Sequence, residues 1–274
     1  MSASATPVTL ITPRGLTSLA EWRELWAARD LGRFIVLRDL KTRYSQSVLG
    51  LGWAIVQPLF TTGVLTLVFG KIAGLSSDGV PYPVWSLAAV VVWTFFQSAA
   101  SEVGNSLAAN IGVLSKVYFP RLVLPLAGMV GRMFDLMIML TMLAIAMVAM
   151  HGQLLRAGCH MQWSALWAVP AALGVAGLSV QYRDVRVAQG FLLQLLMYAS
   201  PVIFPVSYYT RYIPGSVYFL NPLAGVIETL RNCLFGIGPV SVAHLAMGAA
   251  VSAVGLVGGL WCFRRAENVM ADVA

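Results

Sequence analysis

The chain has 274 residues, of which 58% are hydrophobic and only 11% are charged. Soluble globular proteins carry about 25% charged residues, so this composition excludes an ordinary water-soluble domain and indicates a membrane protein. The formal net charge of +7 does not indicate a nucleic-acid-binding protein, because the basic residues flank apolar segments and form no continuous basic stripe.

The segment before the first apolar stretch is rich in cations and has a helical pattern. Trp22 and Trp26 fall on one helical face, whereas Phe34 and Ile35 fall on another. The apolar face therefore rotates near Gly32, and we predict either a bend or two half-helices there. The cations of this segment are Arg14, Arg23, Arg29, Arg33, Arg38, Lys41 and Arg43.

Six apolar segments follow, and about 20 apolar residues are enough to cross a bilayer as a helix. We therefore predict an all-α, polytopic membrane protein with six transmembrane helices. An even number of spans places both termini on the same side. The predicted spans are Leu49–Gly70, Val84–Ala100, Leu122–Met150, Trp163–Val180, Phe191–Val206 and Val240–Phe263.

The distribution of Lys and Arg predicts which side this is. Most of the eighteen cations lie before the first span, in the second-to-third and fourth-to-fifth loops, and in the tail. Because cytoplasmic loops are enriched in Lys and Arg, we expect both termini in the cytoplasm. Residues 1–20 lack the apolar core of a cleavable signal peptide, so we expect the first span to direct insertion.

Charged residues inside a span are costly and are therefore candidate functional residues. Arg132 and Asp135 are three residues apart in the third predicted span, which allows them to pair within one helix. A self-neutralising pair is one interpretation; a proton or ion relay is the other, and it needs further carboxylates, for which Glu102 is the only candidate.

The patterns of enzymes and metal sites are missing from this sequence. The segment "GVLTLVFGKI" at residues 63–72 has the wrong glycine spacing for a phosphate-binding loop, and no nucleophile elbow or H-E-x-x-H pair occurs. The three histidines show no metal-ligand spacing with the cysteines, so we expect no metal site. Whether Cys159 pairs with Cys233 stays open, because a sequence gives no disulfide geometry.

Several motifs, taken together, resemble one known family over about Glu21 to Asp272. They are "RDLKTRYSQSVLGLGWAIVQPL", "PYPVWSLAAVVVWTFFQSA", "NSLAANIGVLSKVYFPRLVLPLA", "VQYRDVR", "YASPVIFPVS" and "LNPLAGVIETLR". In order and spacing they are similar to the membrane subunit of type-2 ABC exporters that move bacterial surface polysaccharides such as O-antigen and teichoic acid. The resemblance implies a permease subunit that performs transport and is not itself an enzyme.

The resemblance also implies roles for two cytoplasmic segments. It places an amphipathic interface helix before the first span, where cations beside indole rings suit an anionic membrane surface; positive-inside anchoring explains the charge alone equally well. It places an ATPase-coupling helix at about residues 109–119. The alternative interpretation of this segment is that it lies buried in the edge of the bilayer. The implied interface residues are Trp22, Trp26, Arg38, Lys41 and Arg43, and the implied coupling residues are Ile111, Leu114, Lys116, Tyr118, Phe119, Arg121, Arg183 and Asp184. Arg183 and Asp184 fit a helix-end cap with its own ion pair equally well.

On the outer side, the family folds the region before the last span into re-entrant helices, here about residues 201–230. Four prolines supply the helix breaks that such a fold needs. The aromatic side chains of this outer region fit either an interfacial belt or a substrate gate. Those of the spans fit either lipid-facing packing or a substrate channel. The candidate channel residues are Trp53, Trp93, Phe96, Tyr198, Phe204, Tyr208, Tyr209 and Tyr212.

The resulting prediction has three parts: a cytoplasmic segment at 1–48, a six-span domain at 49–263 and a cytoplasmic tail at 264–274. We expect a homodimer in the bacterial inner membrane with two copies of an ABC nucleotide-binding subunit, which binds ATP and Mg, while this chain holds no cofactor. The expected cargo is a lipid-linked glycan. Alternatives are another cargo such as teichoic acid, capsule, a drug or a lipid; a secondary transporter; and a membrane-bound glycan enzyme.

Overall fold

The computed structural model of the chain describes residues 19–45, 50–77, 79–110, 112, 119–151 and 183–235, and isolated positions between 246 and 261. The described residues form helices and contain no strand. Their elements are α1 (Leu19–Ala27), α2 (Arg29–Ser45), η1 (Gly50–Gly52), α3 (Trp53–Leu65), the π-helix η2 (Thr66–Ile72), α4 (Tyr82–Ala109), α6 (Val123–His151), α9 (Arg183–Ala199), α10 (Val206–Tyr209), α11 (Gly215–Tyr218) and α12 (Pro222–Phe235).

Three helical segments are long and apolar enough to cross a membrane: Trp53–Ile72, Tyr82–Ser106 and Val123–Ala149. They confirm the positions of the first three predicted spans and make the chain a multi-pass membrane protein. The fourth predicted span lies outside the described residues, and so does most of the sixth. Six spans therefore stay a prediction.

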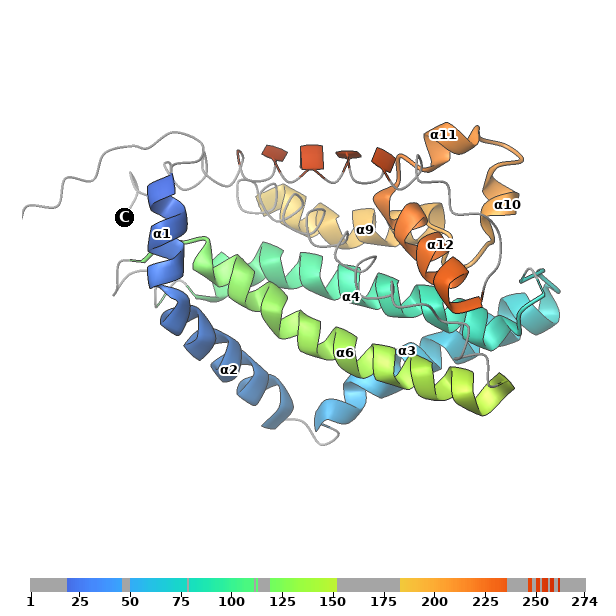
Figure 1. Ribbon diagram of the computed structural model, residues 1–274, viewed down its shortest axis with the longest axis horizontal. Coiled ribbons are helices and arrows are strands. Elements are labelled where there is room, and N and C mark those ends of the chain that lie inside the picture. Colours follow the sequence, from blue (N-terminus) through green and yellow to red (C-terminus); the bar gives the residue numbers. More distant parts are fainter. Residues whose placement is uncertain are drawn as a thin grey trace, which may run out of the picture.

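Helix α4 is the centre of the packing, as Figure 1 shows by its place between α6 and the α9 and α12 pair. Within the three spans, 78% of the α4 segment is buried, compared with 39% for α6 and 17% for α3. Most residues of α4 are apolar, which suits a helix enclosed by others, and its polar residues Thr94, Ser98 and Glu102 recur every four residues on one face. Helix α3 instead leaves most of its apolar surface for lipid or for another chain.

Helices α1 and α2 change direction at Ala28, and α2 then runs obliquely along α6 (Figure 1). The predicted division into two helices is confirmed, and it lies at Ala28, four residues before Gly32. Gly32 lies inside α2, where a Cβ atom would be 3.5 Å from the side chain of Val123 on α6. This is an ordinary van der Waals distance, so the position does not require glycine, and Gly32 does not mark a break.

The fifth predicted span, residues 191–206, has different bounds in the structure. Helix α9 begins at Arg183 and ends at Ala199, and the chain turns before α10. Pro201 accounts for this end, because proline has no amide hydrogen and disfavours the helical conformation in the residue before it. Helices α10 and α11 then fold over one end of the molecule, and α12 returns alongside α4 (Figure 1).

Candidate functional site

Four charged side chains from three helices meet where α2 crosses α4 and α6. Arg43 on α2 binds Glu102 on α4 at 3.1 Å and Asp135 on α6 at 3.2 Å. Arg132 on α6 binds the same two carboxylates, at 2.6 Å and 3.2 Å. Each carboxylate is thus shared by two guanidinium groups. The predicted Arg132–Asp135 pair exists, but it is half of a larger network.

Tyr44 completes this group by donating its hydroxyl hydrogen to Asp135 Oδ1. Burial raises the pKa of Tyr44 to about 12, with a further contribution from Asp135, so the hydroxyl keeps its proton at neutral pH. We refer to Arg43, Tyr44, Glu102, Arg132 and Asp135 as the charge cluster. Its two cations and two anions balance, so it forms neither a net cationic site for a phosphate nor a chain of unpaired carboxylates for ion relay.

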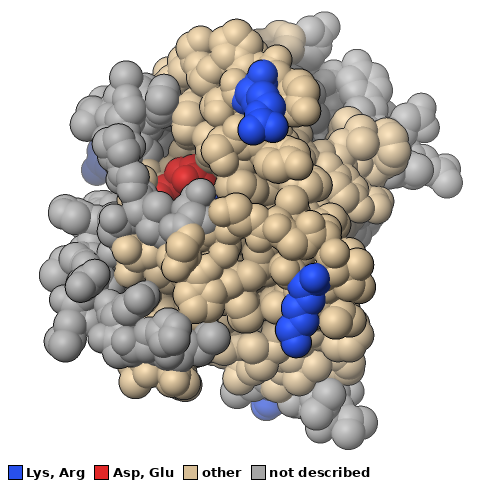
Figure 2. All heavy atoms as spheres, turned by 90° about the vertical axis from the view of Figure 1, so that its right-hand side faces the viewer, with Lys and Arg blue, Asp and Glu red and all other residues tan. Residues whose placement is uncertain are grey.

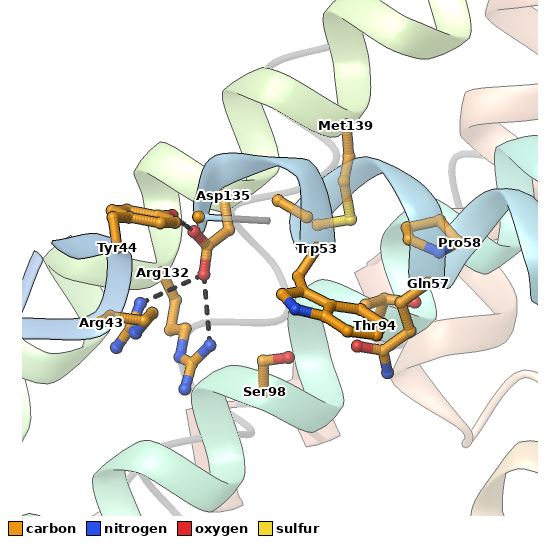
Figure 3. A pocket seen from close by; sticks show the side chains of 12 residues that line it. Arg43, Tyr44, Trp53, Gln57, Pro58, Thr94, Ser98, Arg132, Asp135 and Met139 are labelled. Carbon is orange, nitrogen blue, oxygen red and sulfur yellow. Dashed lines mark hydrogen bonds and ion pairs between the residues drawn. The ribbon is translucent and has the colours of Figure 1, made fainter. Parts of the chain in front are cut away.

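The charge cluster borders a pocket of about 200 Å³. Figure 3 shows the side chains of Arg43, Arg132 and Asp135 on one side of it and the indole of Trp53 with the Gln57 amide on the other. The volume is below the roughly 300–1,000 Å³ of sites that enclose a whole small molecule. The remaining lining residues are Tyr44, Gly50, Ala54, Pro58, Thr94, Ser98 and Met139.

Gly128 lets α6 approach α4 closely enough for the charge cluster to form. A Cβ atom at this position would lie 2.9 Å from Cγ of Glu102, whereas one at Gly131 on the same helix would meet nothing within 4 Å. The Gly128 position therefore has no room for a methyl group unless Glu102 moves.

We expect Gly128→Ala to displace Glu102 and destabilise the chain by about 1–3 kcal/mol, as overpacking does. Gly131→Ala is the matched control and is expected to be neutral or slightly stabilising, since alanine favours helix over glycine by up to about 1 kcal/mol. Thermal unfolding of the purified chain in detergent measures both. Equal melting temperatures for the two variants would contradict the close approach at Gly128.

Helix α2 also contacts both ends of the segment that joins α4 to α6. Before this segment, Arg38 Nη2 donates a hydrogen bond of 2.8 Å to Asn110 Oδ1. After it, Phe119 is 7% exposed and packs in a cluster with Ile35 of α2 and with Val123 and Leu124 of α6. Phe119 thus lies inside the chain, and its predicted contact with an ATPase stays a prediction.

Most other predicted coupling residues cannot be placed in the same way. Arg121 lies in the turn before α6, and Arg183 and Asp184 are the first residues of α9 and not part of a loop, although their side chains are not described. The predicted coupling residues that lie outside the described part of the chain are Ile111, Leu114, Lys116 and Tyr118.

The predicted interface residues divide into outward-facing and inward-facing side chains. Trp26 is 71% exposed, with the Arg29 guanidinium 5.7 Å from its ring centroid, and Lys41 is exposed. Arg38 and Arg43 turn inward to α4 and α6. The side chain of Trp22 lies outside the described residues. Only part of the cationic segment is therefore available to a membrane surface.

The candidate channel residues of the spans behave differently from one another. Trp93 and Phe96 on α4 are buried among the chain's own helices, which contradicts lipid-facing packing for both rings. Trp53 on α3 is 54% exposed and lines the pocket. The structure thus gives the α4 rings a packing role and leaves Trp53 accessible.

The outer aromatic residues contact one another, and some of their rings stay exposed. Phe204 stacks on Tyr208 with ring centroids 5.5 Å apart, and Tyr209 stacks on Tyr218 at 4.7 Å. Tyr209 also donates its hydroxyl hydrogen to the carbonyl of Tyr198 at 2.6 Å. The rings that stay largely accessible are Tyr198, Tyr208 and Tyr212.

Arg231, a cation between the fifth and sixth predicted spans, is buried. It is 2% exposed on α12, where its Nη1 binds Glu228 at 3.0 Å and its guanidinium carbon lies 3.4 Å from the ring centroid of Trp85 on α4. Its Nε also donates to the carbonyl oxygen of Trp85. The three-residue spacing of Glu228 and Arg231 in the sequence could predict that they form an ion pair, but it could not predict that the pair is buried.

Among the described residues, the end of the molecule that carries α10 and α11 is poor in charge. Figure 2 looks at this end and shows isolated basic patches and a small acidic one, with the other described residues uncharged. The opposite end carries the cationic helices α1 and α2. Among the described residues, no group of three or more His, Cys, Asp or Glu side chains is arranged to hold a metal ion.

Comparison with known proteins relates this arrangement to one family. The ABC-2 type transporter family matches residues 32–235. The chain is 25% identical to an O-antigen export system permease protein of Klebsiella pneumoniae over 89% of this chain and 95% of that protein. A Myxococcus xanthus protein of the same description is 25% identical over 85% of this chain and 90% of its own length. A polysialic acid transport protein of Escherichia coli is also 25% identical, over 86% of this chain and 93% of its own length.

The family match covers α2 to α12, and with them the charge cluster and the pocket, while α1 precedes it. The relatives align over nearly their whole length, so the similarity is not confined to a shared fragment. The chain therefore belongs to the ABC-2 type transporter family and is a membrane transport subunit, not an enzyme.

Proposed function

We propose that this chain is the channel-forming subunit of an ATP-driven exporter of lipid-linked polysaccharide. The observation that carries the proposal is that relatives named for O-antigen export and for polysialic acid transport align over 85–89% of the chain. Their two cargoes differ in chemistry but are both long glycans. The proposal is therefore for a surface polysaccharide of the O-antigen type, with teichoic acid or capsule export as the alternative.

We further propose the assembly in which the chain acts. A second copy encloses the channel, for which the sparsely buried α3 offers apolar surface. Two ABC nucleotide-binding subunits bind ATP and Mg and contact the segment at 109–119. The cationic α1 and α2 support a cytoplasmic position for this end, and hence for both termini, in the bacterial inner membrane. The outer helices α10 to α12 then correspond to the re-entrant region.

Deleting the gene for this chain in its source bacterium is expected to remove the polysaccharide from the cell surface and to leave its lipid-linked precursor inside. Export should return only when the chain is supplied together with an active nucleotide-binding subunit, because this chain has no phosphate-binding loop. The measurement is surface labelling of the glycan beside extraction of the intracellular precursor. Export that persists with an inactive ATPase would indicate a secondary transporter, and turnover of the glycan without export would indicate an enzyme.

A further inference from the structure

Helix α2 is attached to the α4–α6 hairpin at two levels. The first level lies at the ends of the connecting segment, where Arg38 binds Asn110 and Ile35 packs on Phe119. The second level is the charge cluster, reached through Arg43, five residues or about 7.5 Å farther along the helix. A helix held at one point can pivot, whereas a helix held at two separated points must move with the body to which it is attached.

The second level resists sliding because its contacts are directional and shared. Both carboxylates contact both guanidinium groups, and the four side chains are between 11% and 27% exposed. A shift of α2 along α6 would separate opposite charges in a partly dehydrated site, where such interactions are stronger than in water. The apolar contact of Ile35 has no such directional requirement.

Helix α2 leads within a few residues into α3, the least buried of the three described spans. The first turns of α3 face the charge cluster across the pocket through Trp53 and Gln57. Along the chain, α2 therefore connects its two points of attachment to the beginning of α3.

We propose that Glu102, Arg132 and Asp135 are positioning residues for transport: they lock α2 to the α4–α6 hairpin, so that movement of the connecting segment reaches α3. This inference rests on the proposed function, in which that segment meets the ATPase. None of the three residues belongs to the predicted coupling or interface set. The role proposed for them is to transmit motion and not to bind ATP or glycan.

The test compares export with ATP hydrolysis in the complete transporter. Glu102→Gln and Asp135→Asn remove one charge each with little change of shape. We expect surface export, divided by the ATP hydrolysis rate of the transporter in membranes from the same cells, to fall about tenfold, within the roughly 5–150-fold range of coupling between sites. Asp30→Asn is the control, because Asp30 lies on α2 but its side chain is 75% exposed, and its ratio is expected to stay at the unmodified value.

A purely structural role predicts a different result. Export and hydrolysis would then fall together with the amount of assembled complex, so a ratio that falls less than about threefold in the charge variants overturns the proposal. Arg43→Lys serves as a further variant in case a carboxylate variant fails to accumulate. It keeps the positive charge but lacks the guanidinium group that reaches both carboxylates, so its ratio of export to hydrolysis is expected to fall by an intermediate factor. An unchanged ratio in Arg43→Lys overturns the proposal as well. Absence of ATP-dependent export by the unmodified complex would instead refute the proposed function.

Discussion

Replacing Glu228 with alanine is expected to lower the apparent melting temperature of the purified chain by roughly 6–12 °C, the equivalent of about 3 kcal/mol. The carboxylate contacts Arg231, whose side chain is only 3% exposed. Within the described part of the chain, Nη2 of this arginine already has no hydrogen-bond partner. Removing the carboxylate leaves a buried guanidinium without its counter-charge, which costs far more than losing a surface pair.

The matched control is Asp30→Ala, because Asp30 and Arg33 also form a pair three residues apart in a helix. Their side chains are 75% and 74% exposed, so the change is expected to cost no more than about 1 kcal/mol. Thermal unfolding monitored by tryptophan fluorescence measures both variants. Similar melting temperatures for the two would mean that Arg231 is hydrated, contrary to its position against Trp85.

Replacing Phe119 with alanine is expected to destabilise the chain by about 3–5 kcal/mol, the usual cost of removing a buried phenylalanine ring. The ring fills the contact between Ile35 on α2 and Val123 and Leu124 on α6. The resulting cavity should also loosen α2, which limited proteolysis of the purified chain detects. Phe134→Ala on α6 is the control, because Phe134 is 51% exposed, and the change should cost within about 0.5 kcal/mol.

This variant also separates two roles for Phe119. A ring that serves as an anchor for the ATPase predicts loss of co-purification of that subunit while the chain's own melting temperature is unchanged. A ring that serves as core predicts a lower melting temperature in the isolated chain, before any partner is added. Unchanged stability of the isolated Phe119→Ala chain would contradict the packing described above.

The charge cluster shows where prediction from local sequence stops. The contact of Arg132 with Asp135 was predictable, because helix geometry brings residues three apart together. Arg43 is separated by 59 residues from Glu102 and by 92 from Asp135. No local pattern relates such positions, so Arg43 was interpreted as an interfacial cation.

The same limit applies to helix ends and helix faces. The prolines of the outer region predicted helix breaks there. Helix α9 nevertheless ends at Ala199, inside the fifth predicted span, because that span was drawn from the run of apolar residues, which continues past Pro201. The burial of Trp93 and Phe96 could not be told from the exposure of Trp53, because hydropathy marks an apolar face without showing whether it meets lipid or another helix.

The sequence by itself determined that this is a membrane protein, where its first three spans lie and which exporter family it resembles. These conclusions depend on properties that a short segment carries alone: enough apolar residues to cross a bilayer, and motifs in a recognisable order. Only the tertiary structure decided that Arg43 and Arg231 point inward, that Phe119 is core, and that α2 is held to both α4 and α6. Each of these depends on which surfaces of distant segments pack together, and that is set by the fit of whole helices and not by the composition of any one of them.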